Sequence, residues 1–126
     1  MKVFVLKKRK DFVKAAQGFK VVVNGLVLLA ALNVSGKNDS CCYVGYTATK
    51  KLGKAHVRNR TKRRLRAAVA IVFPEDALSG VNYVIVGRHN TTKLKFDYLT
   101  RRLRQAVKDI NAQINEAYSP VGEENS

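Results

Sequence analysis

A run of basic residues in the middle of the chain is the feature that most restricts its fold. Nine of the 17 residues from Lys50 to Arg66 are lysine or arginine, and no acidic residue occurs between Ser40 and Pro74. Charges of one sign repel each other and destabilise a compact state unless an anion lies nearby. A glycine comes first, then a helix start, then basic residues interleaved with apolar ones, which is the order of a site and not of a tail.

Composition favours nucleic acid as that anion. The net charge is +15 and the isoelectric point is about 10.2. Phosphates release counterions when lysine and arginine bind them, so nucleic acid is favoured over a membrane surface or an acidic protein. The longest apolar run, Gly25–Asn33, has nine residues, far fewer than the roughly 18–20 that span a bilayer. The charges at the N-terminus follow its apolar residues, unlike those of a secretory signal, so we expect a cytoplasmic protein with no membrane partner.

Length and apolar periodicity predict one domain with an α/β, here α+β, two-layer sandwich. We place the domain at 1–118, with a loosely ordered basic segment at 1–10 and a disordered polar tail at 119–126. The first expected helix covers Phe12–Gln17, with Asp11 as its cap and Gly18 at its end. Strands are expected on both sides of the Asn24–Gly25 turn within 19–34, and a further strand over Cys41–Thr49. A helix from His56 to Phe73 that stops before Pro74, a strand over Val81–Gly87 and a helix from Lys95 to Ala117 complete the chain.

Two of these helices carry apolar stripes, and one strand is apolar almost throughout. The strand Val81–Gly87 is therefore expected in the centre of the sheet. In the helix over 56–73, basic residues cover the surface outside the stripe, and Arg64 lies at its boundary. The stripes consist of Val57, Thr61, Leu65, Ala68 and Val72 in that helix, and of Leu99, Leu103, Ala106, Val107, Ile110 and Ile114 in the last one.

The basic helix has the composition of a phosphate-binding surface, although a merely solvated face is an open alternative. A solvated helix normally mixes charges to gain i,i+4 pairs worth about 0.3–0.5 kcal/mol each, and this helix has no acids. Arginine binds phosphate in a bidentate manner, and Asn59 can reach a base edge or a ribose. The loop before the helix contains Gly53 and three lysines, and the amides of a helix start also suit phosphate. The loop lacks the full Walker pattern.

Residues for catalysis by the protein itself are sparse. General acid–base chemistry needs positioned histidines or carboxylates, whereas His56 and His89 are isolated and expected to be solvated or to face RNA. Cys41 and Cys42 are adjacent, which predicts one small buried side chain beside a partly exposed one and no disulfide. No metal-ligand spacing occurs, so we predict neither a catalytic residue nor a metal site in this chain.

The sequence around the glycine and the basic helix resembles a known family. Lys51-Leu52-Gly53-Lys54-Ala55, followed by the segment from Val57 to Arg66 (VRNRTKRRLR), resembles the RNR signature of the bacterial ribonuclease P protein subunit. The end of the preceding strand, Thr47-Ala48-Thr49-Lys50, also fits this signature. Supporting matches extend the resemblance over roughly residues 6–117, and they are Leu6-Lys7-Lys8, Asp11-Phe12, Gly18, Val44-Gly45 and Arg88.

This resemblance implies a fold and a function. The fold would be an αβββαβα sandwich with a small mixed sheet and a left-handed strand–helix–strand crossover, against the general right-handed rule. The holoenzyme would remove the 5′ leader of precursor tRNA by endonucleolytic cleavage. Catalysis would belong to the RNA subunit with its Mg²⁺, and this chain would bind RNA without an obligate protein partner. A structured-RNA-binding ribosomal or assembly protein is the alternative function, and an autonomous nuclease is a second.

The resemblance also implies two sets of binding residues. A cleft between the first helix and the sheet would bind the single-stranded leader, through an aromatic platform and cations. The residues expected at the RNA subunit are Arg58, Asn59, Arg60, Lys62, Arg63 and Arg66, and those expected at the precursor leader are Phe12, Lys50, Lys51, Lys54 and Arg88.

This chain departs from the family pattern at four positions. Ala16 and Leu29 occupy positions that are often phenylalanine and tyrosine, and His89 and Asn90 replace a frequent Lys-Pro. We therefore expect the cleft to stack fewer bases and to depend more on charge. For Phe12, packing that holds the short helix in place is the open alternative.

Overall fold

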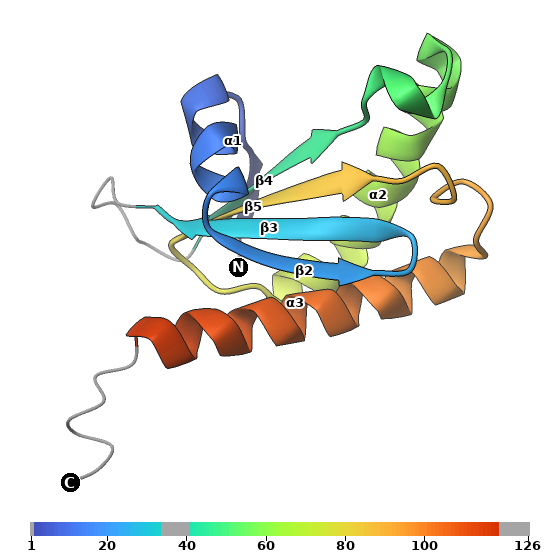
Figure 1. Ribbon diagram of the computed structural model, residues 1–126. Coiled ribbons are helices and arrows are strands. Elements are labelled where there is room, and N and C mark those ends of the chain that lie inside the picture. Colours follow the sequence, from blue (N-terminus) through green and yellow to red (C-terminus); the bar gives the residue numbers. More distant parts are fainter. Residues whose placement is uncertain (1, 34–40, 119–126) are drawn as a thin grey trace, which may run out of the picture.

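The computed structural model describes residues 2–33 and 41–118, without the side chains of Lys50 and Tyr118, and forms a five-stranded sheet with helices on both faces (Figure 1). The predicted loop at 35–40 and tail at 119–126 lie outside the described residues. In chain order the elements are β1 (Lys2–Val5), α1 (Arg9–Ala16), β2 (Phe19–Val23), β3 (Leu26–Leu32), β4 (Cys41–Thr47), a short 3-10 turn (Lys50–Leu52), α2 (Ala55–Asp76), β5 (Val81–Gly87) and α3 (Phe96–Tyr118).

The sheet has the order β1-β4-β5-β3-β2 and is mixed. Strand β4 pairs in parallel with β1 and β5, whereas β3 pairs antiparallel with β5 and β2. Strand β5 is central and six of its seven residues are buried, as its continuous apolar sequence predicts. The predicted α+β class with a mixed sheet is confirmed, whereas the bounds of a single domain and the hand of the β4–α2–β5 crossover stay predictions.

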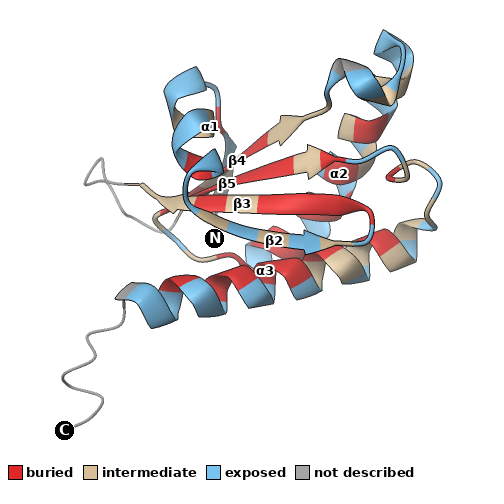
Figure 2. Cartoon of the chain, in the orientation of Figure 1, coloured by how far each residue is buried: buried red, intermediate tan, exposed pale blue. Residues whose placement is uncertain are grey.

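The two faces of the sheet bury cores of different size. Helices α2 and α3 cover one face, where the main core lies, and α1 covers part of the other face over a small cluster of Leu6, Ala15 and Val84 (Figures 1 and 2). Every predicted stripe residue of α3 is buried, and in α2 all are buried except Val57, which is half-buried. The predicted turn joins β2 to β3, and Gly25 has a φ of 104°, which glycine adopts without strain.

The N-terminal segment is more ordered than the sequence predicts. Residues 2–5 form β1, which extends the sheet beside β4, so the observed order is the expected αβββαβα preceded by a strand. The alternating side chains of this strand give the physical reason. Val3 packs against the main core, and the Phe4 ring lies 5.6 Å from the ring of Tyr43 on the opposite face.

Helix α1 begins three residues earlier than predicted, and Asp11 does not cap it. The N-cap is Lys8, whose side chain makes no capping hydrogen bond, and the Asp11 amide donates to the Lys8 carbonyl at 3.0 Å. Asp11 instead lies in the first turn, where the helix dipole favours a carboxylate. Gly18 follows the helix end as predicted, but for another reason, because a Cβ there would overlap the Ala30 carbonyl oxygen.

Helix α2 continues past the predicted stop at Pro74. It ends at Asp76, so the proline lies in the last turn, where its missing N–H removes one intrahelical bond. Contacts from α3 hold this turn. Arg104 pairs with the Asp76 carboxylate at 2.7 Å, and the Asn111 amide donates to the Asp76 carbonyl at 2.8 Å. Tertiary contacts therefore extend the helix beyond the point that local sequence predicts.

Candidate nucleic-acid interface

The start of α2 presents backbone amides and lysines together. After β4, the chain makes the 3-10 turn and passes Gly53, whose φ of 125° is suited to glycine. Lys54 is the N-cap and its side chain makes no capping hydrogen bond. Lys51 and Lys54 are exposed, and the first turn of this 22-residue helix contains no acidic residue. The positive end of the helix dipole and the lysines therefore act on the same region of solvent.

One face of α2 is fixed tightly against the sheet and the following loop. Thr61 is buried, its hydroxyl donates to the Val57 carbonyl at 2.9 Å, and its methyl group occupies the space that a Cβ on Gly87 would need. The Arg64 guanidinium donates to the Leu94 carbonyl and thus connects α2 to the loop before α3. Arg64 therefore has a structural contact, in agreement with its predicted position at the edge of the stripe.

The other face of α2 carries the residues expected to bind the RNA subunit. Asn59, Arg60, Arg63 and Arg66 are exposed, and Arg58 and Lys62 are half-buried. Within residues 2–33 and 41–118, the only ion pairs join Arg104 to Glu75 and Asp76. The basic face of α2 is therefore free of intramolecular ion pairs in this part of the chain, and its charge is available to an external anion.

Arg66 has an aromatic partner that sequence reasoning missed. Its guanidinium lies 5.4 Å from the centre of the Tyr46 ring, within the range of a cation–π contact. Burial raises the pKa of Tyr46 to about 12, although the nearby Arg66 charge acts in the opposite direction. The contact positions Arg66 at the junction of β4 and α2, and only long-range pairing could have revealed it.

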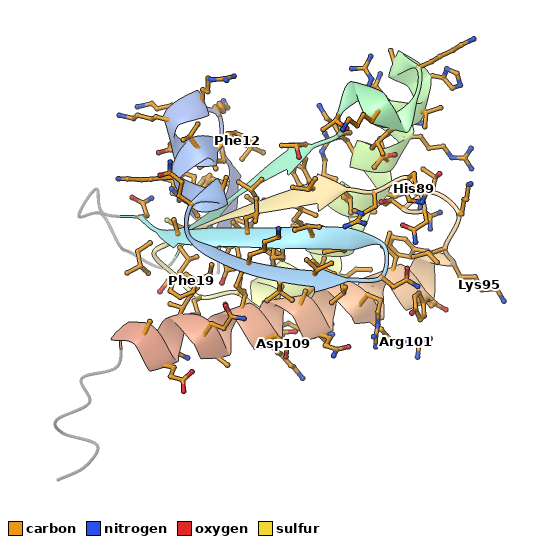
Figure 3. The ribbon with its side chains drawn as sticks, viewed as in Figure 1. Phe12, Phe19, His89, Lys95, Arg101 and Asp109 are labelled. Carbon is orange, nitrogen blue, oxygen red and sulfur yellow. The ribbon has the colours of Figure 1, made fainter. Side chains whose placement is uncertain are left out.

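Phe12 lies on the other face of the sheet. Its ring covers Gly45 of β4, because a Cβ built on that glycine would overlap the ring, and it packs against the cluster of Leu6, Ala15 and Val84. Figure 3 shows Phe12 on α1. Phe12 is half-buried, so the same ring contributes to packing and contacts solvent. Leu29 packs at the same cluster, and Ala16 is exposed one helical turn after Phe12 on α1, so two of the four departures from the family pattern lie near Phe12.

Arg88 follows the carboxyl end of β5 and is exposed. Its backbone is held by Thr91, which the sequence did not indicate as a site residue. The Arg88 amide donates to the Thr91 hydroxyl oxygen at 2.7 Å, and that hydroxyl donates to the Gly25 carbonyl at 2.7 Å. Thr91 is fully buried, so it connects the Arg88 loop to the β2–β3 turn. Thr91 and Thr92 follow the end of β5 in the sequence. Threonine after a strand is only a weak sequence signal for a turn in which the hydroxyl binds nearby backbone.

The predicted binding residues form two groups. Lys51, Lys54 and Arg88 follow the carboxyl ends of the neighbouring parallel strands β4 and β5 and thus share one edge of the sheet, and Phe12 covers Gly45 on the face beside it. The six residues on α2 belong to the helical layer on the opposite face. The Lys50 side chain lies outside the part of the chain that the structure describes.

The described residues offer little for covalent chemistry. His56 and His89 are exposed (Figure 3 shows His89 beyond β5), and no group of three or more His, Cys, Asp or Glu side chains could hold a metal within the described ranges. Cys42 is buried and Cys41 half-buried, as predicted, and burial raises the pKa of Cys42 to about 11. Among the same residues, no helix has the length and hydrophobicity needed to cross a bilayer.

Comparisons with known proteins agree with this geometry. Residues 1–111 match the family model for ribonuclease P. The ribonuclease P protein component of Gluconacetobacter diazotrophicus is 47% identical over 105 residues, which cover 82% of this chain and 87% of the relative. That of Paramagnetospirillum magneticum is 44% identical over 111 residues, or 85% of this chain and 82% of the relative.

Solved structures share the fold at lower identity. The ribonuclease P protein of Thermotoga maritima superposes with a TM-score of 0.70 at 24% identity, covering 83% of this chain and 96% of that protein. The Staphylococcus aureus protein gives a TM-score of 0.68 at 22% identity, covering 85% and 94%. The family match over most of the sequence, together with this fold and its basic α2, shows that the chain belongs to the family of bacterial ribonuclease P protein components.

Proposed function

We propose that this chain is the RNA-binding accessory subunit of a ribonuclease P ribonucleoprotein that removes the 5′ leader of precursor tRNA. The observation that carries the proposal is the basic face of α2, whose cations have no acidic partner within the described residues, in a member of this family. Uncompensated arginines on a rigid helix are suited to the closely spaced phosphates of a folded RNA.

In this proposal the catalytic RNA binds α2. Arg60 and Arg63 are exposed, so each can reach a phosphate without breaking an intramolecular contact. Asn59 lies beside them and can bind a base edge or a ribose hydroxyl. Because Thr61 and the Gly87 backbone fix the opposite side of α2, the basic side chains start from a rigid helix and lose less entropy on binding.

The leader of the precursor binds the other face of the sheet. The half-buried ring of Phe12 supplies a stacking surface, and Lys51, Lys54 and Arg88 supply cations at the adjacent edge. Lys50, predicted in the same set, belongs to the same turn. With Ala16 and Leu29 in place of aromatic residues, binding depends on fewer stacked bases and more on phosphate charge, so it is strongly salt-dependent.

The RNA subunit carries the chemistry in this account. Mg²⁺ is then an ion of the RNA, where it would activate the attacking water and stabilise the leaving oxygen. The protein's part in this proposal is to bind and position RNA. We also propose that the complex acts in the cytoplasm on precursor tRNA and needs no further protein.

Binding of precursor and mature tRNA to the assembled complex tests the leader assignment. The protein should increase the affinity of the catalytic RNA for precursor tRNA and leave its affinity for mature tRNA nearly unchanged, because only the precursor has a leader. An equal increase for both RNAs would contradict the assignment and favour a general structured-RNA-binding role.

A further inference from the structure

A separate groove lies along the flank of α1 that carries Lys10, Asp11 and Lys14. It has a volume of about 540 Å³, and its walls come from residues 5–8, α1 and the ends of β3, β4 and β5 near Tyr43 and Asn82. This volume falls within the roughly 300–1,000 Å³ that is typical of small-ligand sites. Phe12, Lys51, Lys54 and Arg88 do not line the groove.

Helical geometry separates this groove from the surface around Phe12. Phe12 is two residues from both Lys10 and Lys14, and two residues correspond to about 200° around a helix. The Phe12 ring covers Gly45, whereas the groove contains Tyr43, which is two positions earlier on the same strand and about 7 Å away along it. Helix α1 therefore stands between this groove and the surface around Phe12 on one face of the sheet.

The groove carries an excess of positive charge. Its lining includes Lys7, Lys8, Lys10 and Lys14 but only one acid, Asp11, which leaves a net charge of +3 from four lysines and one aspartate. All four lysines are exposed, and none forms an ion pair with a described residue. Asp11 already lies in the favourable field at the start of α1. The lysines thus attract an anion, and lysine binds phosphate as a mobile point charge.

The inner wall of the groove offers an unused donor and an aromatic ring. Asn82 is only 6% exposed, and its Oδ1 accepts a hydrogen bond from Asn33 Nδ2 at 3.3 Å. Asn82 Nδ2 donates to no residue that the structure describes, and it is not one of the buried side-chain nitrogens that lack a partner, so this donor is accessible from the groove. Its register partner Tyr43 is half-buried and supplies a ring next to this donor.

We propose that this groove is a second RNA-binding site, which takes one unpaired nucleotide. The base lies against Tyr43 and accepts a hydrogen bond from Asn82, and the adjoining phosphates contact the lysines of α1 and residues 7–8. A base within a duplex remains stacked between its neighbours, so only an unpaired nucleotide can enter. The inference depends on the proposed function for one point alone, that the ligand is RNA.

The double variant Lys10→Ala/Lys14→Ala tests the groove, with Lys95→Ala/Lys108→Ala as a control that removes the same charge from exposed positions in or next to α3 (Figure 3 shows Lys95). The probes are a single-stranded oligouridine, the catalytic RNA alone and a precursor tRNA with a long leader. Two lost phosphate contacts should flatten the slope of log K against log salt by about 1.4 and weaken binding roughly 25-fold at about 0.1 M salt. The control should keep the parental slope.

The three probes distinguish the source of the nucleotide. If Lys10→Ala/Lys14→Ala loses affinity only for oligouridine and precursor tRNA, the groove binds the leader. If it loses affinity for the catalytic RNA, the groove binds the RNA subunit. Either result supports the inference. Equal slopes for the two double variants with all three RNAs would overturn it. If that happens while Arg60, Arg63 or Phe12 variants still lose affinity, only the groove inference fails and the proposed function stands.

A second variant tests the inner wall. Asn82→Asp keeps the oxygen that accepts from Asn33 but replaces the donor with a negative charge. Weaker oligouridine binding by a variant that melts cooperatively supports the site. Parental binding by such a variant shows that the Asn82 donor is not used and overturns the proposed contact with the base.

Discussion

Replacing Arg60 and Arg63 with alanine should weaken binding of the catalytic RNA in a way that depends steeply on salt. Both side chains are exposed on α2, and neither forms an ion pair with a described residue. Alanine has at least the helix propensity of arginine, so the double variant should fold with a stability within about 0.5 kcal/mol of the parent.

The magnitude follows from the number of phosphate contacts. Each contact contributes about 0.7–0.9 to the slope of log K against log salt, so loss of two contacts flattens the slope by about 1.4–1.8. At about 0.1 M salt this corresponds to roughly 25- to 60-fold weaker binding, and the difference nearly disappears at about 1 M. Loss of a surface contact that does not involve a phosphate would not make the affinities of variant and parent approach each other at high salt.

Filter binding of the catalytic RNA over a salt series measures both quantities. Lys95→Ala/Lys108→Ala serves again as the charge-matched control, and circular dichroism melts check folding. If the variant and the parent have parallel salt slopes, Arg60 and Arg63 do not contact phosphates, and α2 would instead be a solvated helix face.

Three other changes give independent tests. Phe12→Leu keeps an apolar side chain but removes the ring. It should weaken precursor binding by about 1–3 kcal/mol, which is the contribution of one base stacked on an aromatic ring, and leave mature tRNA binding unchanged. A large fall in melting temperature without an effect on precursor binding would show that Phe12 serves packing alone. Gly87→Ala places a Cβ against the Thr61 methyl group and should destabilise the fold by about 1–3 kcal/mol. Adding Thr61→Ser removes that methyl group and should restore most of the loss in thermal melts, whereas no recovery would contradict the contact. Burial raises the pKa of Cys42 from 9.0 to about 11 and that of Tyr46 from 10.0 to about 12. Both groups hold their protons more tightly when folded, so their contribution is full below pH 9 and is lost as the pH rises from about 9 to 12. Chemical denaturation across this range should show decreasing stability, and a flat profile would contradict these shifts.

The parts of the fold that the sequence predicts best are those with strong local periodicity. The apolar run Val81–Gly87 became the central strand, and the apolar stripe of α3 is buried along its length. The basic face of α2 was equally predictable, because the side chains that remain outside an amphipathic stripe must face solvent. In each case one element's own residues decide which side is buried.

The features that the sequence could not predict depend on distant partners. Strand β1 has four residues before a lysine-rich segment, and it becomes a strand because β4, almost 40 residues later, offers an edge. The last turn of α2 stays helical after Pro74 because Arg104 and Asn111 of α3 bind Asp76. The Arg66–Tyr46 contact, the Thr91 anchor and the groove beside α1 are likewise brought together only by tertiary structure.

The central claim is that this protein assists an RNA that carries the catalysis. Cleavage of precursor tRNA by protein alone, catalytic RNA alone and both together, at low and high Mg²⁺, tests it most directly. We predict no cleavage by the protein alone, cleavage by the RNA alone at high Mg²⁺, and a large gain from the protein at low Mg²⁺, because its cations replace part of the counterion requirement. Cleavage by the protein alone, or no gain at low Mg²⁺, would contradict the claim.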